Sequence, residues 1–320
     1  IPVEEYSVGP MPERQSMPEV RATDSVYLMS YFKASAQHLF YAYSRDGKTW
    51  TDINGSRPVF NAYDDEVWLR DPYLHRVTHN GKTKFHLIHT WGWDHPALFH
   101  WESDDLIHWT AANGGTRTDD GKIMLMDGHD GGPVSPNAWA PEFTYDGQTG
   151  TFYLYWSSRI GDRQVHHYCT TKDWFTFSTP AVYFDPGFTA IDMTILKEGD
   201  TYYAYYKDER NGEKTIRCAT SKSLDPRVQR FEGSTPLLPS RYIEVEGPEV
   251  FPAIGGKGWF LYFDKFNGDR GVSYTGCTDP SQHKWYPIPD DEIRNPTEVK
   301  HGSVEIISTA ELEKLLEHFK

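Results

Sequence analysis

The chain has 320 residues, of which 46 are acidic and 32 are basic, so its formal net charge at pH 7 is −14. A surface with this excess of negative charge and no run of Lys or Arg repels a phosphate backbone or an anionic membrane, which disfavours nucleic-acid binding. No apolar run approaches the roughly 20 residues that a membrane helix needs, so we expect no membrane insertion.

Aromatic and turn-forming residues are both abundant, with 20 Tyr, 17 Phe, 11 Trp, 26 Gly and 21 Pro. This mixture predicts many short strands. All-β ring folds commonly reach this length as one domain, so we expect a single domain over residues 1–320. The cysteines Cys169, Cys218 and Cys277 are odd in number and form no CxxC pair, which predicts buried thiols and neither a disulfide framework nor a zinc site.

The first 24 residues are rich in Pro and Glu and have no periodicity, which predicts an extended arm over residues 1–24. The chain begins at Ile1, without Met and without a signal peptide, which suggests processing or a sequence shortened for expression. Strand patterns follow at 26–31 and 38–43. They lead directly into a turn at 44–50.

That turn is the first copy of an internal repeat. Ser or Thr begins it, Asp follows two residues later and an aromatic residue ends it, at 44–50, 103–109 and 171–177, with looser copies from 221 and 278. The starting positions lie about 50 to 68 residues apart, within or a little above the spacing of β-propeller blades. We expect Trp50, Trp109 and Trp285, which belong to these turns, to pack between blades.

Each repeat opens with a strand that carries a distinctive motif. The motifs are Asp71-Pro72, Trp139-Ala-Pro-Glu142, Ile191-Asp192, Glu246-Gly-Pro248 and His301-Gly302. The last of these strands, 301–307, has no following strands, and the strands within 26–50 have no opening strand. We expect them to pair as a fifth blade, which would close an all-β, five-bladed β-propeller and remove its open edges.

The chain ends in a helix pattern at 309–320. Ser308 and Glu311 have the spacing of a capping box at its start. Four apolar residues fall on one helical face, which predicts packing and no chemistry: Leu312, Leu315, Leu316 and Phe319.

The innermost strands of a propeller all start at the same end of the central channel, so their opening residues should converge there. The residues expected to meet are Asp71, Glu142, Asp192, Glu246 and His301. The ends of the second strands and the loops that follow them should surround the same pocket, with Trp91, Trp93, Trp139, Trp156, Arg159, Lys207, Asp208, Asp264, Lys265, Phe266 and Arg270. Carboxylates ringed by indoles and a few cations suit a sugar ring.

The order of the five opening motifs resembles glycoside hydrolase family 43, a family of five-bladed propeller enzymes, over roughly residues 26 to 307. The resemblance implies an inverting hydrolase in which Asp71 is the general base and Glu246 the general acid. Asp192 would orient the sugar and raise the pKa of the proton donor. Its motif reads Ile-Asp-Met, where many members have Ile-Asp-Pro, so its backbone is less rigidly specified.

Inversion is chemically consistent with this set, because it needs a protonated carboxyl and an ionised carboxylate about 6.5–9.5 Å apart across the sugar. Each acid taken alone could instead cap a turn or pair with a neighbour, as Asp71 could with Arg70. Three acids at strand openings together favour catalysis.

Other residues have two readings. Trp139 and Glu142 could pack or contact substrate, whereas we expect Trp91 and Trp93 to stack on a sugar. His301 could be a core histidine; the resemblance instead implies a place on the axis near a metal ion or water. A structural Ca²⁺ near His301 is therefore one alternative, although the chain has no Asp/Asn-rich calcium loop. We expect that the reaction requires no cofactor.

The leading hypothesis is an inverting exo-glycosidase that removes terminal α-L-arabinofuranose or β-D-galactofuranose/galactose from plant or microbial polysaccharide side chains. An exo-β-1,3-galactosidase and a β-xylosidase are alternatives. A non-catalytic sugar-binding propeller is a second class, disfavoured because the opening motifs differ between blades. A retaining fructan-type hydrolase would need an Asn-Asp-Pro motif near the N-terminus, which is absent. A polysaccharide substrate implies a secreted or periplasmic protein.

Overall fold

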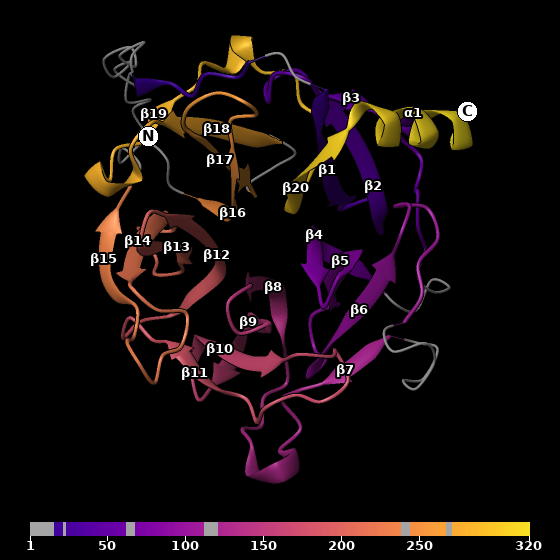
Figure 1. The fold of residues 1–320 in the computed structure, drawn as a ribbon. Helices are drawn as coiled ribbons and strands as arrows, with labels where there is room; N and C mark the ends of the chain where they lie inside the picture. The colour runs from indigo at the N-terminus through magenta and orange to yellow at the C-terminus, as the bar shows by residue number, and fades with distance from the viewer. Residues whose placement is uncertain (1–15, 22–23, 62–67, 112–120, 238–243, 267–270) are drawn as a thin grey trace.

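The computed structural model describes residues 16–21, 24–61, 68–111, 121–237, 244–266 and 271–320. Its strands form five four-stranded antiparallel sheets around a central axis (Figure 1). The predicted five-bladed β-propeller is confirmed.

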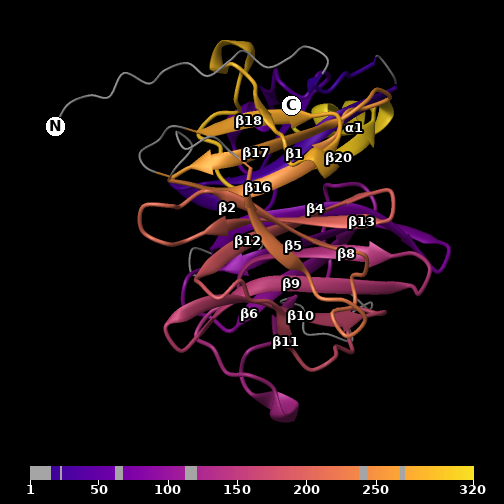
Figure 2. The same cartoon turned by 90° about the vertical axis from the view of Figure 1, so that its left-hand side faces the viewer.

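In every blade the first strand lies beside the axis and the next three follow outward (Figures 1 and 2). From the axis outward, the blades are β4(Leu69–His79), β5(Lys82–Trp91), β6(Ala97–Ser103) and β7(Lys122–Met124); β8(Trp139–Asp146), β9(Thr151–Ile160), β10(Arg163–Thr171) and β11(Ala181–Phe184); β12(Ala190–Glu198), β13(Thr201–Asp208), β14(Ile216–Ser221) and β15(Glu232–Pro236); β16(Val245–Pro252), β17(Trp259–Lys265), β18(Val272–Cys277) and β19(Tyr286–Pro287); and β20(Gly302–Ser308), β1(Ser25–Lys33), β2(Ala36–Ser44) and β3(Thr51–Asp52). Short 3-10 helices lie at Asn54–Ser56, His129–Gly131, Pro280–Gln282 and Asp290–Glu292.

The ring closes where the two ends of the chain share a blade. β20 pairs antiparallel with β1, in a register that runs from Ser25 opposite Ser308 to Tyr31 opposite Gly302. The closure predicted between the strands at 26–50 and the C-terminal strand is therefore confirmed. Of the predicted N-terminal arm, residues 16–21 are described, and Glu19 forms a backbone bridge to Lys257 at the turn between β16 and β17.

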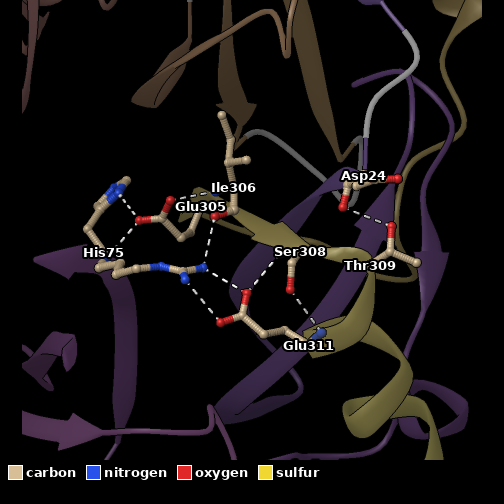
Figure 3. Close-up of polar contacts among 8 residues, drawn as sticks. Asp24, His75, Glu305, Ile306, Ser308, Thr309 and Glu311 are labelled. Carbon is tan, nitrogen blue, oxygen red and sulfur yellow. Dashed lines mark hydrogen bonds and ion pairs between the residues drawn. The ribbon is translucent and has the colours of Figure 1, made fainter. Parts of the chain in front are cut away.

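The C-terminal helix α1(Thr309–His318) begins with the predicted capping box. The Ser308 hydroxyl accepts a hydrogen bond from the N–H of Glu311, and the Glu311 carboxylate accepts one from the N–H of Ser308 (Figure 3). The same carboxylate binds the guanidinium of Arg76 in β4 at 2.8 Å, so the helix is fastened to the adjacent blade. Leu312 and Leu315 are buried as expected, whereas Leu316 is 36% exposed at the edge of that face.

The repeated turn has one hydrogen-bond pattern in three blades. The first-position hydroxyl accepts from the N–H three residues on, from Gly47 to Ser44, Leu106 to Ser103 and Trp174 to Thr171. The Asp at the third position accepts from two further N–H groups in each copy. The sequence repeat is therefore a repeated local structure.

Five apolar clusters fill the spaces between neighbouring blades. Trp50 and Trp285 are buried in two of these clusters and Trp109 packs against a third, as predicted. Cys169, Cys218 and Cys277 are free and buried, each in the third strand of its blade. Of the helices in the described part of the chain, none has the length and apolar character that crossing a bilayer requires.

Candidate active site

A β-bulge interrupts four of the five innermost strands at the same position. The pairing register shifts between Arg70 and Tyr73 in β4, Trp139 and Glu142 in β8, Ile191 and Thr194 in β12, and Glu246 and Glu249 in β16. The first residue of each bulge has a positive φ: 48° at Asp71, 47° at Ala140, 58° at Asp192 and 58° at Gly247. Left-handed backbone at a non-glycine residue is strained, and both bulges and such strain concentrate at functional sites.

Aligning the blades by these bulges shows how the three acids at the strand openings relate to one another. Asp71 and Asp192 occupy equivalent positions, but Glu246 stands one residue earlier, at the position of Arg70 in β4. The three acids are therefore not strictly equivalent. Glu142 follows its bulge and corresponds to Glu249 in β16.

Asp71 is held by Thr90 of β5 and by His301, which directly precedes β20. Thr90 donates its hydroxyl to Oδ2 of Asp71 at 2.9 Å, and Nδ1 of His301 lies 3.3 Å from Oδ1. Burial acts to raise the pKa of Asp71, but the hydrogen bond and charge of His301, with the nearby Arg70, outweigh it and lower that pKa. Asp71 is therefore ionised at neutral pH.

His301 and Asp71 stabilise each other's charged forms. Burial acts to lower the pKa of His301, but the hydrogen bond and charge of Asp71 outweigh it and raise that pKa to about 9. The guanidinium of Arg70 instead donates to Gln37 at 2.8 Å and lies over the ring of Phe32. The ion-pair partner of Asp71 is thus His301 and not its sequence neighbour Arg70.

Asp192 bridges two blades. Its Oδ2 accepts a hydrogen bond from the N–H of Gly247 at 3.0 Å, and its own N–H donates to the hydroxyl of Ser157 at 3.3 Å. Burial raises the pKa of Asp192 to about 7, an effect that His301 opposes and the charges of Glu246 and Asp71 reinforce. Asp192 is therefore partly protonated near neutral pH.

Glu246 lies between the ammonium group of Lys207 and the buried carboxyl group of Asp264. Nζ of Lys207 is 3.0 Å from Oε2 of Glu246 and also contacts Glu209. The cross-strand neighbour of Glu246 is Asp264, which pairs with Lys300 at 3.5 Å. Burial raises the pKa of Asp264 to about 7, although Lys300 opposes this shift.

An aromatic rim adjoins the carboxylates. Trp93 is 57% exposed, and Trp68 is 39% exposed and meets it edge to face at 6.0 Å between ring centroids. The indole N–H of Trp139 donates to the carbonyl of Trp93 at 2.8 Å and holds this loop in place. Trp91 differs, because it is half-buried, stacks on His95 and packs against an inter-blade core.

Several predicted contacts fall elsewhere. Trp156 is 1% exposed within an inter-blade core and donates to Ser158, so it cannot face a substrate. Asp208 is buried and bound by the guanidinium groups of Arg210 and Arg217, which assigns it to the scaffold. Arg159 is exposed at the end of β9. Arg270 lies outside the described residues.

Thr90, which the sequence places beside the acids, supports the pocket, whereas sequence reasoning missed Trp68 and Glu249. Thr90 links Asp71 to the next blade by accepting a hydrogen bond from the N–H of Ala140 at 2.8 Å. Trp68 precedes the Asp71 motif by three residues, and its aromatic type at that point was the available signal. Glu249 would have emerged only from an alignment at the bulges.

Below the acids, the channel holds a second pair of carboxyls, Glu142 and Glu249. Both are buried, and Oε2 of each has no hydrogen-bond partner among the described residues. Burial raises the pKa of both carboxyls. Glu249 lies 3.9 Å from His75. His75 in turn lies 3.0 Å from Glu305 (Figure 3). Unpartnered carboxylate oxygens are the ligand type that Ca²⁺ takes, so these residues fit a structural cation.

Comparison with known proteins agrees with this architecture. A family model described as a probable glycosyl hydrolase domain, of the family-43-related type, matches residues 24–313. An α-L-arabinofuranosidase of Bifidobacterium longum subsp. longum is 27% identical over 249 residues, which make up 63% of this chain and 22% of that protein. The chain thus spans about a fifth of that relative's length.

Two solved structures show the same fold. A family-43 β-1,3-galactosidase has a TM-score of 0.60 at 13% identity, and the match covers 84% of this chain and 57% of that one. An endo-1,4-β-xylanase from Bacteroides thetaiotaomicron has a TM-score of 0.58 at 16% identity, with 90% and 98% covered. Because the family model spans the whole propeller, the chain belongs to the glycosyl hydrolases related to family 43.

Proposed function

We propose that the chain is an inverting exo-glycosidase that removes terminal α-L-arabinofuranose or β-D-galactofuranose/galactose from polysaccharide side chains. Asp71 is the general base and Glu246 the general acid. Asp192 is the second acid, which orients the sugar and modulates the proton donor. In this reaction Asp71 takes a proton from water as the water attacks the anomeric carbon. Glu246 gives a proton to the leaving oxygen.

The state of Asp71 is the observation that carries the proposal. A general base has to be ionised at the working pH, and His301 and Thr90 hold Asp71 in that form. Their two bonds also fix the orientation of the carboxylate, which is what an in-line attack by water requires.

The place of Glu246 supports its role as the acid. It lies on a different blade from Asp71, and its side chain is 31% exposed, so a glycosidic oxygen can reach it. Asp192 lies beside it, because its carboxylate binds the N–H of Gly247, the next residue along the chain.

The choice of sugar rests on the relatives. The curated relative is an α-L-arabinofuranosidase, which favours arabinofuranose. Solved neighbours include a β-1,3-galactosidase and an exo-β-1,3-galactanase from Clostridium thermocellum, which keep galactose-containing chains as the second candidate. The exposed Trp93 and Trp68 supply a stacking surface for a sugar in either case. A polymeric substrate favours secretion or periplasmic residence.

We also propose a structural Ca²⁺ in the channel, held by Glu142 and Glu249 below His301. Bound there, it would neutralise two buried carboxylates and stiffen the ring without entering the reaction. Millimolar Ca²⁺ should raise the melting temperature of wild type, and Glu142→Gln should abolish that increase. An unchanged melting temperature in wild type would contradict the site.

The test of activity compares hydrolysis of nitrophenyl α-L-arabinofuranoside, β-D-galactofuranoside, β-D-galactopyranoside and β-D-xylopyranoside. Glu246→Gln and Asp71→Asn should each lower kcat by roughly 10²–10⁴-fold on the sugar that wild type accepts. Glu232→Gln, on the exposed outer strand β15, is the matched control and should change nothing. Proton NMR of the first-formed anomer tests inversion. Undiminished activity in both site variants would overturn the assignment.

A further inference from the structure

Away from the channel, β5 and β6, the two middle strands of the blade β4–β7, bring three metal-ligating side chains together. His86 of β5 lies directly opposite Glu102 of β6, and His100 lies two residues before Glu102. Side chains two residues apart on a strand share a face, so all three project from one side of the sheet. Their ligand atoms lie within 4.8 Å of one another.

The separations match those of ligands around one small cation. Nδ1 of His86 is 3.0 Å from Nε2 of His100 and 3.8 Å from Oε1 of Glu102. Two ligands on a tetrahedral Zn²⁺, with bonds of about 2.0–2.1 Å, stand roughly 3.3 Å apart. Small side-chain rotations therefore convert the present arrangement into a coordination shell. We propose that His86, His100 and Glu102 form a structural zinc site.

The donor set favours Zn²⁺ over the hard cations. Two imidazoles and one carboxylate suit zinc, whereas Ca²⁺ and Mg²⁺ take shells made mainly of oxygen. Both histidines are buried among aromatic rings, an environment that disfavours the charged imidazolium and keeps the neutral form that binds metals. A water completes the fourth position.

The neighbouring blade already fixes both imidazoles. The ring of His100 stacks on Trp174 at 3.7 Å with an interplanar angle of 4°, and His86 lies over the same indole at 5.4 Å and 20°. Trp174 belongs to the repeated turn at 171–177 in the blade β8–β11, so the site lies at a blade interface. Bound zinc would link β5 to β6 and stiffen the surface against which this turn packs.

A cleft gives zinc access to the site, where the ion would replace the hydrogen bond between His86 and His100. A cleft of about 630 Å³ is lined by His86, Glu102 and Trp174 and opens there. Lys84 also lines the cleft, but Asp104 pairs with it at 2.8 Å and offsets its charge. One of the two facing nitrogens carries the proton of the hydrogen bond between His86 and His100. On zinc binding, that proton moves to the other nitrogen of the same imidazole ring. Both facing nitrogens then ligate.

The experiment uses the untagged full chain, freed of metal with a chelator. Calorimetric titration with Zn²⁺ measures affinity and stoichiometry, and Co²⁺ gives a visible spectrum that reports the geometry. His86→Gln and Glu102→Gln each remove one ligand, and the second changes a partly exposed side chain with little risk to folding. His108→Gln is the control, because His108 is an exposed histidine that also stands beside a carboxylate, Asp105.

We expect one Zn²⁺ per chain and a tetrahedral Co²⁺ spectrum in wild type and in His108→Gln. Affinity should fall by at least roughly 100-fold in His86→Gln and Glu102→Gln. The rise in melting temperature that zinc causes in wild type should disappear in these two variants. No binding by folded wild type would overturn the proposal, as would binding that survives both ligand variants or is lost only in His108→Gln.

Discussion

The backbone N–H of Gly247 donates a 3.0 Å hydrogen bond to Oδ2 of Asp192, and this bond joins two neighbouring blades at the mouth of the channel. Because Gly247 directly follows Glu246, this hydrogen bond also sets the position of Glu246. Asp192 therefore has two separable properties, a negative charge and a hydrogen-bond acceptor. Different substitutions can remove one or both.

Asp192→Asn keeps an acceptor for Gly247 but removes the charge. We expect kcat to fall by roughly 10²-fold with the fold retained, because the charge and not the bond is lost. Asp192→Ala removes both and should lower stability as well. Equal unfolding free energies for the Asn and Ala variants would show that the bond to Gly247 contributes nothing.

The raised pKa of Asp192 gives the Asn variant a pH signature. Because this pKa is about 7 when folded and 3.8 in its unperturbed form, the contribution of Asp192 to stability is greatest below pH 3.8 and is lost as the pH rises through about 7. The melting temperature of Asp192→Asn, relative to wild type, should therefore increase from pH 4 to pH 8. A constant difference across that range would contradict the shift.

His301→Gln tests the pair that holds the base. Removing His301 takes away the main partner that lowers the pKa of Asp71, so Asp71 should ionise only at higher pH. The acidic limb of the kcat/KM profile should move upwards, while activity at pH 8 falls much less. An acidic limb that stays in place would show that His301 does not control the base.

The same pair predicts a stability window. The raised pKa of His301 contributes stability that is fully present below 6.5 and lost as the pH rises through about 9. The lowered pKa of Asp71 contributes stability that is present above 3.8 and lost as the pH falls through its folded value. A double-mutant cycle of His301→Gln and Asp71→Asn should therefore give its largest coupling between pH 3.8 and pH 6.5, and the coupling should decline as the pH rises towards 9.

Much of the fold could be predicted from the sequence because its signals are local. The repeated Ser/Thr-x-Asp turn supplies its own hydrogen bonds, as between Ser44 and Gly47, so each copy marks a blade without knowledge of the rest. Ring closure followed from a count of strands that lacked partners. The five opening motifs then placed Asp71 and Glu246 at one end of the channel.

The remaining details depend on backbone geometry that the sequence does not display. The bulge after Trp139 shifts the register of β8 against β9. The side chain of Trp156 in β9 lies inside a blade interface. The offset of Glu246 from Asp71 becomes visible only when the bulges of β4 and β16 are aligned. Asp208 was misassigned because Arg210 and Arg217, both nearby in the chain, turn to bind it.

Trp93→Ala tests the aromatic rim. Loss of one stacking surface costs about 0.5–1.5 kcal/mol, so KM for an oligosaccharide should rise roughly 2- to 12-fold with kcat nearly unchanged. Phe175→Ala is the matched control, because Phe175 is an aromatic residue of similar exposure in the repeated turn of another blade. An effect of equal size in both variants would exclude a specific sugar contact at Trp93.

Gly247→Ala tests why glycine stands between Glu246 and Pro248. A Cβ at this position would lie 2.6 Å from Cγ of His301, and the backbone φ is 58°. Gly199 provides a matched control, because its φ is 59° but a Cβ there would meet nothing within 4 Å. Both substitutions incur the cost of left-handed backbone, about 1–2 kcal/mol, whereas only Gly247→Ala displaces His301.

The difference between the two variants therefore isolates the contact with His301. Urea denaturation should show a larger loss of unfolding free energy for Gly247→Ala than for Gly199→Ala. Only the first should also lose most of its activity, because His301 holds Asp71. If the two variants lose equal stability and keep equal activity, the ring of His301 moves aside freely and Gly247 serves only the bend of the chain.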